Sequence, residues 1–199
     1  MTGPDRPAKV LLVDDRRDNL LALEAILQGL PVQAVAAESG EEALKHLLVD
    51  DFALILLDAQ MPTMDGFETA RHIKRRERTR HVPIIFLTAA DRDSHLALRG
   101  YAAGAVDYLT KPFDPWVLRA KVSVFVELWT KTAQLAVLSE LVKARDGELR
   151  AAGVAVDEAT ALLKAGLAAG GEVGRSQVEK AMETLTRAFR QAPGSSARP

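Results

Sequence analysis

Five short runs of hydrophobic residues divide the first two thirds of the chain, and amphipathic segments separate them. The runs lie at 9–13, 32–37, 53–57, 84–87 and 106–109. The third is continuously apolar and does not alternate, which is typical of a strand buried on both faces of a parallel sheet. Strands that alternate with helices of about 10–15 residues predict an α/β fold, a five-stranded parallel doubly wound sheet with helices on both faces.

The segments between the runs have helix signals. Asp18 is expected to cap a first helix, and Ser39 with Glu42 has the capping-box spacing that begins a second. A charged amphipathic helix is predicted over 66–78 and a weaker one over 91–103. Right-handed crossovers would place the carboxyl ends of all five strands on one edge of the sheet.

The remainder of the chain is predicted to be helical. A helix is predicted to begin at Asp114 and Pro115, and no further glycine or proline occurs before Gly147. This helix is longer than is needed to cover the sheet, so it projects beyond the sheet. Apolar residues follow alternating heptad spacings along it, with Lys131 and Arg145 as polar breaks. This seam predicts a coiled-coil homodimer, and the alternative is packing against the chain's own C-terminal helices. The seam residues are Leu128, Leu135, Leu138, Val142 and Leu149.

Two further helices are expected to form a small hairpin. One is predicted over 157–169, and Ser176 with Glu179 has the capping-box spacing that begins the other. The predicted organisation is a flexible N-terminus at 1–8, an α/β domain at 9–130, an all-α helical extension at 131–192 and a disordered tail at 193–199.

Composition adds little about function. The chain has 199 residues, of which 48% are hydrophobic and 27% charged, and its net charge of -1 gives no general attraction to nucleic acid or anionic membranes. No apolar run approaches the roughly 20 residues needed to span a bilayer, so no membrane association is expected. The chain has no cysteine, which excludes disulfides and thiolate metal sites and suits the cytoplasmic location that we expect.

Reactive side chains gather at the predicted strand ends. Asp14 and Asp15 follow the first strand, and Asp58 ends the third. Thr88 follows the fourth strand, and Lys111 follows the fifth. Three carboxylates brought together repel one another and favour a cation among them. Oxygen ligands favour a hard ion, Mg²⁺ or alternatively Mn²⁺. Such an ion beside a lysine and a hydroxyl suits phosphoryl chemistry, with Asp58 as the nucleophile that forms an acyl phosphate.

The same residues resemble the motifs of a known family. The matching segments are Asp14-Asp15, D-A-Q-M-P-T-M-D-G at 58–66, Thr88-Ala89-Ala90, and Y-L-T-K-P at 108–112. Over residues 8–130 the pattern resembles the receiver domain of two-component response regulators, with a flavodoxin-like sheet. The resemblance is specific because four separated motifs fall at the expected strand ends in the expected order.

The resemblance implies a role in a phosphorelay. Asp58 would accept a phosphoryl group from a sensor histidine kinase or a phosphotransfer protein. Mg²⁺ would be bound by Asp14 or Asp15, by Asp58, and by the backbone carbonyl of Gln60.

The resemblance also implies a conformational switch. The Thr88 hydroxyl would move toward the phosphoryl group, the Tyr108 ring would rotate inward, and Lys111 would pair with the phosphoryl oxygens. The peptide bond between Lys111 and Pro112 is expected to be cis, as X-Pro bonds can be. We predict that the change near Lys111 is transmitted along Pro115–Lys143.

Three functions stay open at this point. The first is a signalling switch whose helical extension dimerises or docks onto a protein that the sequence does not name. The second is a transcriptional regulator that binds nucleic acid, although no dense basic recognition helix indicates it. The third is a metal-dependent phosphohydrolase, which would need a second acid–base residue and a substrate pocket. We therefore expect self-phosphotransfer and autodephosphorylation but no enzyme activity on other substrates. Because no histidine follows His95, the C-terminal helices cannot carry a phosphohistidine.

Overall fold

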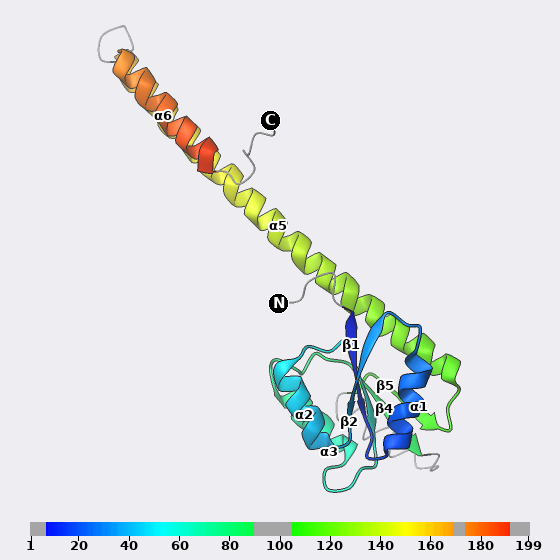
Figure 1. Cartoon of the computed structure of the whole chain (residues 1–199). Helices are drawn as coiled ribbons and strands as arrows, with labels where there is room; N and C mark the ends of the chain where they lie inside the picture. The colour runs from blue at the N-terminus through cyan, green and yellow to red at the C-terminus, as the bar shows by residue number, and fades with distance from the viewer. Residues whose placement is uncertain (1–6, 90–104, 169–173, 192–199) are drawn as a thin grey trace. The chain divides into compact units, whose positions relative to one another are not determined.

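The computed structural model describes residues 7–89, 105–168 and 174–191. Within these residues, five parallel strands form one sheet in the order β2-β1-β3-β4-β5 (Figure 1). The predicted doubly wound sheet is thereby confirmed, with strand ends that differ from the predicted ones by one or two residues. The helix predicted at 91–103 and the tail at 193–199 lie outside the described residues. The strands are β1 (Ala8–Val13), β2 (Val32–Ala37), β3 (Leu54–Asp58), β4 (Ile84–Ala89) and β5 (Asp107–Lys111).

The sheet separates two apolar layers. Helices α2 (Gly40–Val49) and α3 (Gly66–Arg75) cover one face, and α1 (Arg17–Leu27) with the beginning of α5 (Pro115–Ala168) covers the other (Figure 1). Alternate residues of β1 belong to the two layers, Leu11 to the first and Leu12 to the second. The apolar runs are continuous because the central strands face a helical layer on both sides.

The N-terminal cap of α2 is determined by local sequence, whereas the start of α1 is determined by contacts with the reactive edge of the sheet. The Glu42 N–H donates to the Ser39 hydroxyl oxygen at 3.2 Å, so the predicted cap of α2 is confirmed. The prediction that Asp18 caps α1 is wrong, because Arg16 is the N-cap residue and Asp18 lies in the first turn. The Arg16 N–H instead donates to the Asp14 carboxylate at 3.0 Å, so the reactive edge of the sheet positions the start of this helix.

The described part of the C-terminal region contains two helices, α5 and α6 (Arg175–Gln191). The prediction of a separate helix at 157–169 is wrong, because α5 is continuous over 54 residues. It passes through Gly147 and Gly153, which an α-helix tolerates at a cost of about 0.5–1 kcal/mol each. The chain divides into an N-terminal unit, Met1–Gln134, and a C-terminal unit, Leu135–Pro199. No helix among the described residues is both long and apolar enough to cross a membrane.

Gly66, the first residue of α3, fits its position only because it has no side chain. A Cβ atom there would lie 2.1 Å from the carbonyl oxygen of Asp58 and 2.9 Å from Cα of Ala59. We expect Gly66→Ala to lower the free energy of unfolding by about 1–3 kcal/mol, because backbone must move to admit the methyl group. Urea denaturation followed by tryptophan fluorescence measures this, since Trp116 and Trp129 both lie in the N-terminal unit.

Gly147→Ala is the matched control. A Cβ atom at Gly147 would meet nothing within 4 Å, and alanine is the better helix former by about 0.5–1 kcal/mol. This change should leave the N-terminal unit unaffected and should not lower helicity. An unfolding curve of Gly66→Ala that matched wild type would contradict the close packing of α3 against the end of β3.

Candidate functional site

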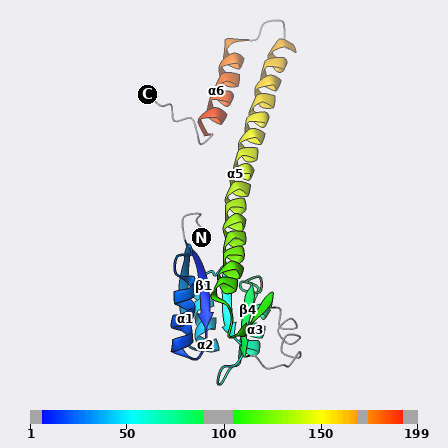
Figure 2. The same cartoon turned by 90° about the vertical axis from the view of Figure 1, so that its right-hand side faces the viewer.

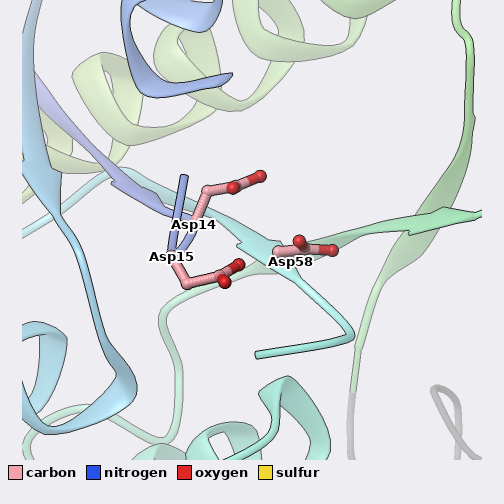
Figure 3. Close-up of side chains that lie close together, drawn as sticks. All are labelled: Asp14, Asp15 and Asp58. Carbon is pink, nitrogen blue, oxygen red and sulfur yellow. The ribbon is translucent and has the colours of Figure 1, made fainter. Parts of the chain in front are cut away.

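Three carboxylates meet where β1 and β3 end. Val13 and Leu57 are register partners in these neighbouring parallel strands, so the residues that follow them, Asp14 and Asp58, lie side by side. Oxygen atoms of Asp14, Asp15 and Asp58 all lie within 4.8 Å of one another (Figure 3). Asp14 is 0% and Asp58 8% exposed, whereas Asp15 is exposed. The predicted acidic cluster therefore combines two buried acids with one that faces solvent.

Lys111 joins the two buried acids. Its Nζ lies 2.8 Å from Asp14 Oδ2 and 3.2 Å from Asp58 Oδ2. Lys111 ends β5, two strands away from β3, and its long side chain spans that distance along the carboxyl edge of the sheet. One positive charge thus faces two buried negative charges, which leaves a net negative site that a cation would stabilise.

Asp14 is further held by groups that the sequence did not single out. The Asn19 amide donates to both of its carboxylate oxygens, at 2.8 and 3.0 Å, and the Arg16 N–H donates to one of them. Sequence reasoning missed Asn19, and the only available signal was a polar residue in the first turn of the helix after the Asp-Asp pair. This network fixes the orientation of Asp14 beside Lys111.

Burial raises the pKa of the Asp58 carboxyl above its ordinary value. The Lys111 charge opposes this rise in pKa, and the neighbouring Asp14 charge adds to it. Hydrogen bonds from Lys111 and from the Gln60 N–H, the latter at 3.4 Å, also favour the ionised form. The ionised nucleophile is therefore held in a partly desolvated environment, and a bound cation would favour its charged state.

The raised pKa makes stability depend on pH. A carboxyl whose pKa is higher in the folded than in the unfolded protein contributes stability at low pH, and loses it as pH rises through the folded pKa. Without a metal ion, we expect Asp58→Asn to be more stable than wild type at neutral pH, with a difference that shrinks as the solution is acidified. Urea denaturation in EDTA across a pH series measures this, and a difference of constant size would contradict it.

The predicted switch residues Thr88 and Tyr108 lie on β4 and β5. Thr88 is nearly buried and follows Leu87, the register partner of Asp58. Tyr108 lies on the edge strand β5 and is 42% exposed.

The remaining predicted site residues follow the same edge. Gln60 lies two residues after Asp58 and is exposed. The peptide bond between Lys111 and Pro112 is cis. Asp65, which sequence reasoning read only as part of a turn, caps α3 by accepting a hydrogen bond from the Glu68 N–H at 2.7 Å. The cluster, the lysine and the nearby hydroxyl together form an oxygen-rich site suited to a divalent cation and a phosphoryl group.

Comparison with known proteins identifies the class. The family model described as the response regulator receiver domain matches residues 10–123, which is more than half of the chain. The chain belongs to this family, and the receiver domain predicted from the motifs is confirmed.

Individual curated relatives match this chain over the receiver region. The response regulator PleD of Caulobacter vibrioides is 40% identical over 115 residues, which is 58% of this chain and 25% of that protein. The alkaline phosphatase synthesis transcriptional regulatory protein PhoP of Bacillus subtilis is 36% identical over 118 residues, 59% of this chain and 48% of that protein. The chain thus matches only a quarter to a half of the length of these curated relatives.

Solved structures match the same region. The chemotaxis protein CheY4 of Vibrio cholerae superposes with a TM-score of 0.56 at 30% identity, over 59% of this chain and 98% of that one. A structure of a probable two-component system response regulator/GGDEF domain protein gives a TM-score of 0.57 at 31% identity, over 62% of this chain and 51% of that one. These similarities define the fold and the receiver.

Proposed function

We propose that this protein is a phosphorelay response regulator whose Asp58 accepts a phosphoryl group from a sensor histidine kinase or a phosphotransfer protein. The observation that supports this most directly is the cluster of Asp14, Asp15 and Asp58 beside Lys111. An Asp58 oxygen attacks phosphorus, and the new O–P bond forms as the N–P bond of the phosphohistidine breaks. The imidazole leaves, and Asp58 becomes an acyl phosphate.

The neighbouring groups stabilise the transferred charge. Lys111 exchanges part of its contact with Asp58 for a phosphoryl oxygen, and the Thr88 hydroxyl donates to another. The all-oxygen donor set fits Mg²⁺, with Mn²⁺ as a substitute, held by Asp14 or Asp15, Asp58 and the Gln60 carbonyl. When bound, the ion supplies positive charge that offsets the carboxylates and the phosphoryl oxygens.

Metal removal tests this role. We expect a small acyl phosphate such as acetyl phosphate to add one phosphoryl group to the chain in Mg²⁺, and EDTA to abolish the reaction. Asp15→Asn should lower the affinity for Mg²⁺ by about 10–100-fold or more, because it removes a charged ligand from the exposed side of the site. Asp18→Asn is the control, since Asp18 is an exposed acid nearby that is not part of the cluster. Intact-mass spectrometry measures the product, and undiminished phosphorylation in EDTA would contradict the metal-assisted mechanism.

We propose that the output is a helical one. The seam residues Leu128, Leu135, Leu138, Val142 and Leu149 are all exposed on α5, which supports their pairing with a second copy or with a downstream protein. Phosphorylation would act through the beginning of α5, along Pro115–Lys143. The chemistry is confined to the protein's own phosphoryl group, and the protein works in the cytoplasm, where histidine kinases use ATP.

Light scattering with and without beryllofluoride, a phosphoryl mimic, tests control of self-association. We expect a larger dimer fraction with the mimic, because the phosphoryl-dependent change reaches α5. A monomer in both conditions, with binding of the mimic shown by tryptophan fluorescence, would contradict pairing through α5.

A further inference from the structure

The C-terminal unit buries very little apolar surface by itself. Among its described residues, the buried side chains are all alanines, Ala155, Ala159 and Ala181. Larger apolar side chains stay exposed on both helices, and Leu149 and Met182 are each 62% exposed. Because a two-helix hairpin with an alanine core gains too little from apolar burial to offset its chain entropy, a partner is needed to cover the exposed side chains.

A groove and buried side chains show which sides of the unit's two helices face each other. In both views, α6 folds back beside the end of α5 (Figures 1 and 2), so these helices run antiparallel. A groove between them is lined by Ala151 and Ala155 from α5 and by Thr184 and Ala188 from α6. The buried residues Ala155 and Ala159 of α5 and Ala181 of α6 mark the facing sides of the hairpin.

Most of the larger exposed apolar residues lie on one flank of the hairpin, and Val154, which is 59% exposed, lies on the other. Val156 follows Ala155, and Met182 follows Ala181; each step turns the side chain by about 100° around its helix. Because the two helices are antiparallel, both rotations lead to the same side of the hairpin. The same flank is extended one or two turns away by Leu149 and Val178.

We propose that this flank, the hairpin face formed by Leu149, Val156, Val178 and Met182, binds the same face of a second copy to form a four-helix bundle. A two-fold axis along the bundle places α5 of one copy against α6 of the other. The inference rests on the proposed pairing of two copies through α5 and deepens it, because α6 becomes part of the interface.

The exposed area is sufficient for a stable dimer. Each large aliphatic side chain, when more than half exposed, offers on the order of 100 Å² of apolar surface. Leu135, Leu138 and Val142, which lead into the hairpin face, are more than half exposed, as are Leu149 and Met182, whereas Val156 and Val178 are 48% and 39% exposed. Together these side chains supply on the order of 500–600 Å² per copy. Stable interfaces bury about 800 Å² per partner, and polar rim atoms contribute the remainder. The hairpin face continues the seam along α5, because Leu149 follows Val142 by seven residues and Val156 follows Leu149 by seven.

Arg145 supplies electrostatic complementarity in this arrangement. It lies four residues before Leu149 and so shares its side of α5. Glu148 of α5 and Ala188 of α6 line the same groove. Arg145 lies about one turn before Glu148 and Gln191 about one turn after Ala188, so in these antiparallel helices Arg145 is level with the end of α6. In the bundle, Arg145, which pairs with Glu148 of its own helix at 2.8 Å, therefore also faces the C-terminal end of the other copy's α6, where the helix dipole favours a cation. A second copy thus accounts for a polar break in the seam.

Introducing a charge on α6 tests the bundle. We expect Met182→Glu to weaken dimerisation of the full chain at least about tenfold, because a carboxylate would be buried without a partner. Lys180→Glu is the control, since two residues along a helix turn the side chain to the opposite side of α6. Light scattering over a concentration series measures the dissociation constant. A wild-type value for Met182→Glu, or a monomeric wild type, would overturn the inference.

A second readout does not depend on a destabilising change. The chain contains no cysteine, so a tagged Val156→Cys variant can be mixed with an untagged Val178→Cys variant and oxidised. We expect a disulfide-linked heterodimer, because these positions face each other across the two copies. Failure to form it would overturn the bundle. Phosphorylation assayed in the same samples reports on Asp58 separately, so failure of the bundle and failure of the receiver function are distinguished.

Discussion

Asp58→Asn is expected to abolish phosphorylation of the chain by acetyl phosphate and by a phosphorylated kinase. The amide nitrogen is a poor nucleophile, and the amide oxygen lacks the charge needed to attack phosphorus. The fold should persist, because the amide keeps the shape of the carboxyl and removes a buried charge whose ionisation burial disfavours. Loss of activity should therefore be accompanied by equal or greater thermal stability in metal-free buffer.

A control for this variant is Asp51→Asn. Asp51 is exposed and pairs with Arg78 at 3.2 Å on the surface, outside the acidic cluster. Phosphorylation of Asp51→Asn should equal that of wild type in rate and extent. If Asp58→Asn still gained one phosphoryl group in Mg²⁺, another residue would be the acceptor and the proposed function of Asp58 would be wrong.

Lys111→Met should destabilise the N-terminal unit and disable the switch. Its Nζ is the cation that faces both Asp14 and Asp58, and its removal leaves two buried carboxylates without that charge. We expect a loss of roughly 2–4 kcal/mol in EDTA, less than for a fully buried pair because Asn19 still donates to Asp14. Mg²⁺ should restore part of that loss, since it supplies positive charge at the same place.

Lys121→Met is the matched control for this effect. Lys121 also pairs with an aspartate, Asp107, but both side chains are about one third exposed. Partly exposed pairs of this kind contribute about 0–1 kcal/mol. Urea denaturation of the two variants, each with EDTA or Mg²⁺, compares them directly. Equal losses, or a loss in Lys111→Met that Mg²⁺ does not reduce, would contradict the electrostatic role of Lys111.

The sheet and its reactive edge could be predicted because local pattern and tertiary position agree there. Leu54–Leu57 is apolar on both pleat faces, and the abrupt change to Asp58 marks the strand end. Register then brings Asp14 beside Asp58 without further information. The Asp18 cap was mispredicted because Asp14 binds the backbone of Arg16, a contact that depends on the assembled site and not on local spacing.

The C-terminal helices were less predictable from sequence. The helix predicted separately at 157–169 belongs to α5, because Gly147 and Gly153 each cost only about 1 kcal/mol, which a long helix absorbs. α5 therefore continues to Ala168. Heptad spacing identified an apolar seam on α5. It could not show that α6 leaves one side of α5 uncovered, because the uncovered side depends on which faces of the two helices meet.

Locating the phosphoryl group on the chain tests the proposed function most directly. The chain would be phosphorylated in Mg²⁺ and reduced with borohydride, which converts an aspartyl phosphate to homoserine, and then mapped by peptide mass spectrometry. We predict homoserine at position 58 and unmodified Asp14 and Asp15. Conversion at another residue, or no conversion in a folded, Mg²⁺-loaded sample, would contradict the role of Asp58 as phosphoacceptor.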